Sequence, residues 1–148
     1  QLAKAEGLRV IADSSTEDKE LVTELGADVV VPRGDNISEQ IRNIMPEGVD
    51  GLADGSVQNE LSVGAIREGG SFASVRYWEG TGERDIKFHR TSVSDYFQRS
   101  DLLDQLSKQV DDGILTLRVA ETFSAEQATE AHKKLEAGGT RGRCVILL

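Results

Sequence analysis

The chain has 148 residues and a formal net charge of −9, and 38% of its residues are hydrophobic, which is enough for a globular domain. An acidic surface repels phosphate groups, so we expect neither nucleic acid nor an anionic membrane as a partner. The single cysteine, Cys144, excludes an internal disulfide and a cysteine-based zinc site, and we expect a cytoplasmic protein. No stretch has the length and hydrophobicity of a membrane span, and we expect no signal peptide.

The first residues, from Gln1, are typical of the last turns of a helix that stops at Gly7. We therefore expect the sequence to be part of a longer protein. Short apolar runs and amphipathic stretches then alternate along the chain. They predict strands at residues 8–12 and 27–31 and, between them, a helix at residues 16–25 with Thr16 as its N-cap.

The middle of the sequence continues the alternation, with helices ended by glycine or proline. The patterns predict helices at residues 37–44, 60–67 and 96–111, a turn at 68–70, and strands at 49–53, 71–75 and 86–93. Residues 114–119 alternate apolar and polar side chains. A last helix is predicted at residues 124–136, with Ser124 and Gln127 as a capping box, and a closing strand at residues 144–148.

Strands that alternate with helices are typical of an α/β fold with parallel strands and right-handed connections. We find no internal repeat, no low-complexity tract and no linker. Residues 114–148 read as an appended module rather than as a further strand–helix unit.

The order of several segments is distinctive. QLAKAEG and LRVIA are followed by LVTELGADVVVP, GVDGLADG and AIREGGSFASV. The stretch GILTLRVAETFSAEQATEAHKKLEAGGTRGRCVIL is the most specific, because it combines a helix, His132, a glycine pair, Gly142 and a final strand. Together these segments resemble the medium-chain dehydrogenase/reductase superfamily over essentially the whole chain. The resemblance is greatest to its quinone oxidoreductase-like, zinc-independent branch.

The resemblance implies a Rossmann-like, doubly wound parallel sheet that lacks its first strand and glycine loop, since no G-x-G-x-x-G motif occurs in the sequence. Residues 1–113 would form a partial nicotinamide-cofactor domain. Residues 114–148 would return to a GroES-like substrate domain. The strands beside the absent first strand would lose their ladder partners.

The resemblance also places the adenosine ribose of the cofactor at the end of the strand predicted at residues 8–12. Asp13, Ser14, Ser15 and Lys19 follow that strand, and hydroxyl and basic side chains there favour NADPH over NADH. Asp13 opposes this preference, because an acidic side chain repels a 2′-phosphate. A second role is open for residues 14–16, which could simply turn the chain and cap the next helix.

Further cofactor-binding candidates follow the later strands. Arg33 could fork onto a phosphate or stack on adenine, or could be a solvated surface residue. Gly55 and Ser56 follow the fourth strand of the implied sheet, in a loop that is shorter than the family's. Val75 and Arg76 end the fifth, where the family contacts the nicotinamide carboxamide. Their simpler roles would be a turn for Gly55 and Ser56, core packing for Val75 and a surface charge for Arg76.

No pair of residues suggests a protein nucleophile or a metal site, so we predict neither a catalytic side chain nor a metal ligand. Phe88 and His89 could face the same crevice, but a lone histidine is more often structural, and His132 is expected to pack.

The resemblance implies that NADPH supplies the hydride to a quinone or enone. A zinc-type alcohol dehydrogenase, an enoyl-reductase module and a non-catalytic remnant are the alternatives. A homodimer could form through the edge strand between Ile86 and Val93.

Overall fold

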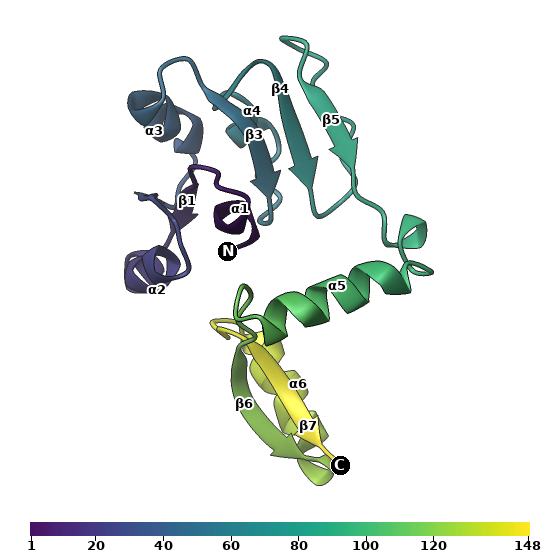
Figure 1. Ribbon diagram of the computed structural model, residues 1–148. Helices are drawn as coiled ribbons and strands as arrows, with labels where there is room; N and C mark the ends of the chain where they lie inside the picture. The colour runs from purple at the N-terminus through teal and green to yellow at the C-terminus, as the bar shows by residue number, and fades with distance from the viewer. The chain divides into compact units, whose positions relative to one another are not determined.

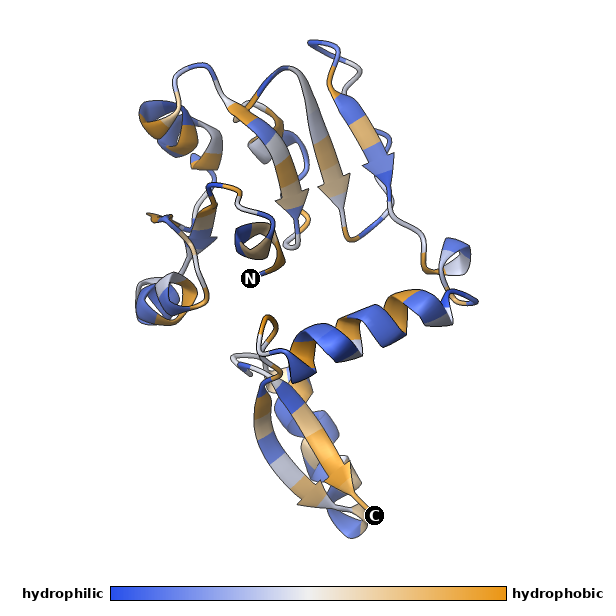
Figure 2. Ribbon diagram, in the orientation of Figure 1, coloured by the Kyte–Doolittle hydropathy of each residue, from blue (hydrophilic) through white to orange (hydrophobic).

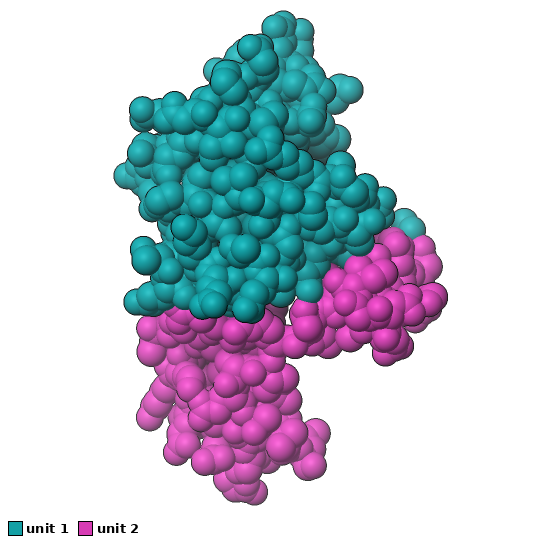
Figure 3. Space-filling model, turned by 60° about the vertical axis from the view of Figure 1, so that its left-hand side comes forward, with its two compact units in different colours: residues 1–100 teal, residues 101–148 magenta.

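The computed structural model describes all 148 residues and contains two compact units, residues 1–100 and residues 101–148 (Figure 3). Every strand pair in both units is parallel, so the predicted α/β fold is confirmed. The boundary between the two units falls between Ser100 and Asp101. The functional division after residue 113 remains a prediction.

The first sheet of the N-terminal unit has two strands, β1 (Ile11–Ser14) and β2 (Val29–Pro32), with Ile11 paired to Val29. Helix α1 (Leu2–Ala5) precedes it, and a 3-10 helix (Thr16–Asp18) and α2 (Lys19–Glu24) connect the strands. The predicted strand at 8–12 begins three residues too early. A reason lies at Val10, whose N–H donates to the Asp28 carboxylate at 2.7 Å, next to Lys4 Nζ at 2.9 Å.

The second sheet of this unit has the order β3 (Val49–Asp54), β4 (Ile66–Ser74) and β5 (Lys87–Arg90) (Figure 1). Helix α4 (Glu60–Val63) lies between β3 and β4 in the chain. Its Val63 packs with Ile66, Phe72 and Ile86 in a buried cluster, and Trp78 contacts the Phe72 ring edge-on with 5.0 Å between centroids. Burial of these large side chains is the main stabilising contribution to this sheet.

Helix α3 (Ile37–Ile44) occupies the full predicted range and connects β2 to β3. Ile37 and Ile41 lie on one face of it, and they form a buried cluster with Val31 and Ala65. Ile11 of β1 packs against this cluster, and so do Val49 and Leu52 of β3. The same helix therefore covers the ends of both sheets.

No ladder joins β1 to β3, so the two sheets remain separate although all their strands run in the same direction (Figure 1). This break confirms the prediction of a Rossmann-like sheet without its first strand. Each of these two strands is paired on one side only, to β2 and to β4 respectively.

The predicted helix at 60–67 and turn at 68–70 are wrong in their boundaries. Helix α4 ends at Val63, and β4 already begins at Ile66, which pairs with Val49. The next pair of the ladder is Gly51 with Ser71, so β4 bulges between these positions. Gly70 lies in the bulge, where a Cβ atom would come within 2.9 Å of the Asp50 carbonyl oxygen. The two glycines that suggested a turn therefore belong to an irregular strand.

Two other boundaries also differ from the prediction. β5 spans only four residues of the predicted strand at 86–93, and Val93 instead begins a 3-10 helix (Val93–Asp95). The helix predicted from residue 96 is α5 (Ser100–Asp111), because the chain turns at Tyr96 and Arg99. The predicted helix began too early because the apolar residues Tyr96 and Phe97 lie in this turn, directly before α5.

The C-terminal unit contains β6 (Val119–Ser124), a 3-10 helix (Ala125–Gln127), α6 (Ala128–Ala137) and β7 (Arg143–Leu147). The predicted capping box is confirmed, and Ser124 N–H donates to Gln127 Oε1 at 3.1 Å. β6 and β7 pair in parallel, and β7 is largely hydrophobic (Figure 2). No helix of the protein has the length and hydrophobicity required to span a bilayer.

Candidate functional site

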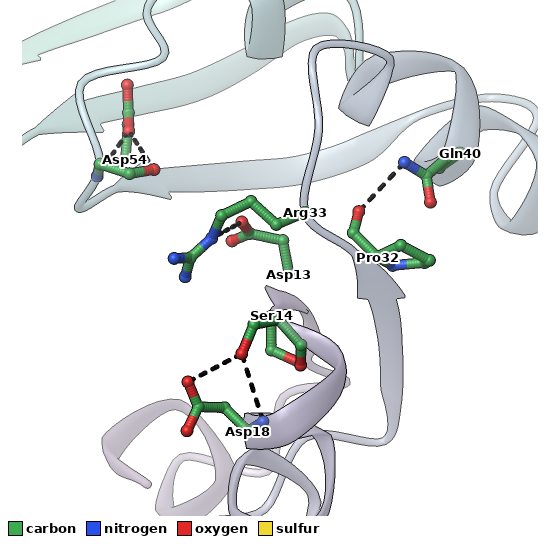
Figure 4. Close-up of polar contacts among 9 residues, drawn as sticks. Asp13, Ser14, Asp18, Pro32, Arg33, Gln40 and Asp54 are labelled. Atoms are coloured by element: carbon green, nitrogen blue, oxygen red, sulfur yellow. Dashed lines mark hydrogen bonds and ion pairs between the residues drawn. The ribbon is translucent and has the colours of Figure 1, made fainter. Parts of the chain in front are cut away.

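The carboxyl ends of β1 and β2 bring an acidic and a basic side chain together. Arg33 Nε lies 3.2 Å from Asp13 Oδ2 (Figure 4), and the Arg33 N–H donates to the Ser14 carbonyl at 2.9 Å. Gln40 of α3 also donates to the Pro32 carbonyl at 3.1 Å, which fixes the end of β2. The acidic charge that opposed a phosphate ligand is therefore paired with the arginine that could bind one.

Ser14 and Ser15 follow directly from β1. The Ser14 side chain is buried, and its hydroxyl donates to the Ser15 carbonyl at 2.9 Å. The Ser15 hydroxyl accepts from the Asp18 N–H at 3.3 Å and donates to its carboxylate at 3.0 Å (Figure 4). Ser15, rather than Thr16, is thus the N-cap of the 3-10 helix. A capping hydroxyl at the surface remains able to accept a second partner.

The loop after β3 is organised by Asp54, a residue that the sequence analysis did not single out as a site residue. Its Oδ1 accepts from the Ser56 N–H at 3.0 Å, and its Oδ2 accepts from the Asn59 N–H at 2.7 Å. Burial alone raises the pKa of Asp54, but these and neighbouring backbone donors outweigh it and hold the pKa below its ordinary value. An aspartate before a Gly-Ser turn is a pattern that could have indicated this role.

The same loop contains unusual backbone geometry. Val57 has φ 61° and Asn59 has φ 48°, in the left-handed region that branched side chains rarely adopt. The side-chain oxygen of Asn59 is buried and has no hydrogen-bond partner. Such strain persists only where the surroundings hold it, and it is concentrated at binding sites. Asp54 supplies that restraint here.

A cleft of about 830 Å³ lies between the unpaired edges of β1 and β3. Five of the residues considered at the sequence level line it, namely Asp13, Arg33, Gly55, Ser56 and His89. Its remaining walls include the apolar side chains of β1, β3 and α3. The cleft therefore joins the end that could take the adenosine to the loop after β3.

The other predicted cofactor-binding residues lie outside this cleft. Lys19 lines a separate shallow depression on α2 with Glu20 and Glu24. Val75 is 62% exposed, and the Arg76 N–H donates to Ser74 Oγ at 3.3 Å. These positions follow the ends of β1 and β4, but the structure does not bring them together with Arg33. Their roles in cofactor binding stay predictions.

The aromatic and histidine candidates differ in their surroundings. Phe88 packs between Phe72 and Trp78, with ring centroids 5.6 Å and 5.4 Å away, so its role is in the core. His89 lines the cleft, and its Nε2 lies 3.4 Å from Ser71 Oγ. His132 is exposed on α6. No cluster of three or more histidine, cysteine or acidic side chains is placed to hold a metal ion.

Parallel strands with polar residues at their carboxyl ends and helices in the connections are typical of doubly wound α/β proteins, whose ligands bind outside those ends. Residues 25–146 match the zinc-binding dehydrogenase family. The chain therefore belongs to this family of the medium-chain dehydrogenase/reductase superfamily, and the predicted superfamily is confirmed.

Two curated relatives and one solved structure extend this assignment. The chain is 26% identical to a zinc-type alcohol dehydrogenase-like protein of Staphylococcus epidermidis, over 100% of this chain and 50% of that protein. It is also 26% identical to a probable quinone oxidoreductase of Schizosaccharomyces pombe, over 99% of this chain and 50% of that protein. A mycobacterial quinone oxidoreductase shares the fold with a TM-score of 0.83 at 23% identity, over 99% of this chain and 51% of that one. The chain thus spans about half the length of the curated relatives it matches.

Proposed function

We propose that this chain supplies the cofactor-binding walls of an NADPH-dependent oxidoreductase that reduces a quinone or an enone. The observation that carries the proposal is the Asp13–Arg33 ion pair at the ends of two adjacent parallel strands, beside two serine hydroxyls. Ligands of open α/β sheets bind outside the carboxyl ends of the strands. A relative named as a probable quinone oxidoreductase supports the substrate class.

The residues at the end of β1 fit the adenosine half of NADPH. Arg33 uses its Nε for Asp13 and is 59% exposed, so its two Nη groups can donate to a 2′-phosphate. Asp13, neutralised by Arg33, repels that phosphate less than a lone carboxylate would. The Ser14 and Ser15 hydroxyls already donate to the Ser15 carbonyl and to the Asp18 carboxylate, so either would donate to the phosphate only after releasing that partner. Lys19 adds positive charge from α2. Preference for NADPH over NADH follows from this set.

The other end of the cleft fits the nicotinamide half. The loop with Gly55 and Ser56 presents backbone groups that Asp54 holds in place. Val75 and Arg76 follow β4 and would contact the carboxamide. When bound, the cofactor supplies a hydride, so the protein has to position it and exclude water. The sequence contains no glycine-rich phosphate loop, and these residues account for the two ends of the cofactor only.

The substitution Arg33→Ala tests the cofactor half of the proposal in the protein that carries this chain. Loss of one charge-assisted contact should weaken NADPH binding about tenfold and leave NADH binding nearly unchanged. Fluorescence titration of the reduced cofactors measures both affinities without turnover. Arg67→Ala is the matched control, because Arg67 pairs with Asp50, at 2.7 Å, near the amino ends of β3 and β4 rather than at the carboxyl ends. Equal affinities of the unsubstituted protein for NADPH and NADH would refute the preference.

A zinc-type alcohol dehydrogenase is the second candidate, and the Staphylococcus epidermidis relative carries that name. The quinone-type and zinc-type proteins differ in their need for metal. Metal analysis of the purified protein, followed by chelation, separates the two. Reduction of a quinone that is unaffected by chelation supports the first candidate, whereas loss of alcohol oxidation on zinc removal supports the second.

A further inference from the structure

Two arginines lie at the carboxyl ends of the adjacent strands β4 and β5. Arg90 is the last residue of β5 and pairs with Ser74, the last residue of β4, and Arg76 follows two residues after Ser74. The two strands are parallel, so they end at the same edge of their sheet (Figure 1). Ligands of open α/β sheets bind outside this edge. Both arginines are therefore carried by the part of the sheet that faces a ligand.

The Arg90 side chain is held by an aromatic ring. Its Cζ atom lies 5.0 Å from the centroid of the Tyr77 ring, which is within the range of a cation–π contact. The Tyr77 hydroxyl donates to Glu79 Oε1 at 2.8 Å, and this bond fixes the ring in turn. Tyr77 is 59% exposed, so the pair lies at the surface. A guanidinium that stacks through its face keeps the N–H donors along its edge free for a ligand.

Neither arginine has an acidic partner. The ion pairs of the structure engage other residues, and Glu79 is bonded to the Tyr77 hydroxyl rather than to Arg90. Arg76 is exposed and uses only its backbone N–H, which donates to Ser74 Oγ at 3.3 Å. On a chain with a net charge of −9, two unpaired arginines at this edge form a local positive region. Such a region attracts an anionic ligand.

The order of the strands separates this region from the phosphate proposed for the cofactor. In the proposed function, Arg33 at the end of β2 receives the adenosine phosphate, and the residues after β3 and β4 receive the nicotinamide. β5 is the next strand beyond β4. Neighbouring strands lie about 4.8 Å apart, so a group at the end of β5 is next to the nicotinamide and far from the 2′-phosphate. An oxyanion bound there belongs to the molecule that receives the hydride.

We propose that Arg90, held over the Tyr77 ring, binds an oxyanion group of the substrate, so that the preferred quinone or enone also carries a carboxylate or a similar group. The inference rests on the proposed function, because it names the substrate class of that site. Two parallel N–H groups of the guanidinium edge match two oxygen atoms of the oxyanion. Arg76 adds positive charge at the end of the neighbouring strand. A neutral substrate lacks these contacts and binds more weakly.

Two quinones that differ only in charge test this proposal on the complete protein that carries this chain. The probes are a naphthoquinone with a propionate side chain and the methyl ester of the same compound. With NADPH as the reductant, kcat/KM for the acid should exceed that for the ester about tenfold, because one charge-assisted contact forms only with the acid. Isothermal titration calorimetry should give the same order of affinities without turnover.

Substitutions assign the preference to Arg90 and its ring. Arg90→Gln should remove the preference by weakening the acid alone, and Arg90→Glu should invert it. Arg67→Gln is the matched control, because it makes the same charge change as Arg90→Gln at the amino end of β4 and should leave the preference intact. Tyr77→Phe retains the ring and should retain the preference, whereas Tyr77→Leu should reduce it because Arg90 loses its support.

Three results would overturn the proposal. They are equal kcat/KM values for the acid and the ester, an unchanged preference in Arg90→Gln, and a loss of NADPH affinity in Arg90→Gln that exceeds its effect on the acid. The last result would mean that the oxyanion is a phosphate of the cofactor. Failure of the proposed function looks different, since neither quinone would then be reduced. Tighter binding of the acid that depends on Arg90 would still support the oxyanion contact in that case.

Discussion

Asp54 stabilises the candidate site through both of its carboxylate oxygens. The side chain is 4% exposed, and it holds the backbone of residues 56–59 while that loop adopts two left-handed conformations. A buried carboxylate of this kind accepts hydrogen bonds from several N–H groups. A replacement with fewer acceptor atoms therefore leaves at least one of these donors unpaired. The residue therefore links the stability of the fold to the shape of the loop that faces the cleft.

The substitution Asp54→Asn should lower the free energy of unfolding by about 2 kcal/mol, because an amide has one acceptor oxygen where the carboxylate has two. Urea denaturation followed by the fluorescence of Trp78 measures this, since the only tryptophan of the chain packs against Phe72 in the same unit. Asp50→Asn is the control. Asp50 forms only an exposed ion pair with Arg67, so its loss should have little effect. Equal losses for the two variants would contradict the role of Asp54.

The contribution of Asp54 should also depend on pH. Its pKa in the folded chain lies below the ordinary value of 3.8, so the folded state favours the ionised form. The stabilisation is therefore fully present above the unfolded pKa and is lost as the pH falls through the folded pKa. The stability difference between the unsubstituted chain and Asp54→Asn should be constant between about pH 5 and pH 7 and should shrink below about pH 4. A difference that instead grew towards acid pH would show that the assigned ionisation is wrong.

At the scale of elements, periodicity predicted the strands and helices that carry a complete apolar pattern. Helix α3 was predicted over its full length because Ile37, Ile41 and Ile44 form one face and Pro46 follows. The bulge in β4 could not be predicted, because a Gly-Gly pair such as Gly69-Gly70 is typical of a turn, and only the pairing of Ile66 with Val49 makes it part of a strand. The Asp13–Arg33 pair likewise depends on the register between β1 and β2, which local sequence does not determine.

Gly70 gives a direct test of the bulge. Gly70→Ala should destabilise the N-terminal unit by about 1 to 3 kcal/mol, because the new Cβ atom would lie 2.5 Å from Ile66 Cγ2 and 2.9 Å from the Asp50 carbonyl oxygen. Gly51→Ala is the matched control on the neighbouring strand, where the nearest atom to a Cβ is the Ser71 carbonyl oxygen at 3.8 Å. Denaturation followed by Trp78 fluorescence should show a lower urea midpoint for Gly70→Ala only. A normal midpoint for Gly70→Ala would mean that β4 is regular there.

At the scale of the whole molecule, the two sheets of the N-terminal unit have four unpaired strand edges. The edges of β1 and β3 face each other across the cleft, and the other two are the outer edges of β2 and β5. The cleft edges combine uncharged residues such as Val10, Ala12 and Ala53 with charged ones such as Asp13 and Asp50. β5 instead exposes Lys87, His89 and Arg90, and charged residues on an edge oppose indiscriminate pairing. The two kinds of edge therefore differ in the partners they can accept.

The predicted homodimer through β5 would bring positively charged side chains of the two subunits together. A two-fold axis at the middle of this four-residue strand would pair Lys87 with Arg90 of the partner subunit, and the same repulsive pair would occur twice. Lys87→Glu converts both pairs into attractive ones, so we expect dimerisation to strengthen on the order of tenfold, as measured by analytical ultracentrifugation. Lys133→Glu on α6 makes the same change in net charge away from β5 and should have no such effect.

Salt should promote association of the unsubstituted chain and weaken that of Lys87→Glu, because it screens repulsion in the first and attraction in the second. A chain that stays monomeric with Lys87→Glu at every salt concentration would exclude β5 as the dimer interface.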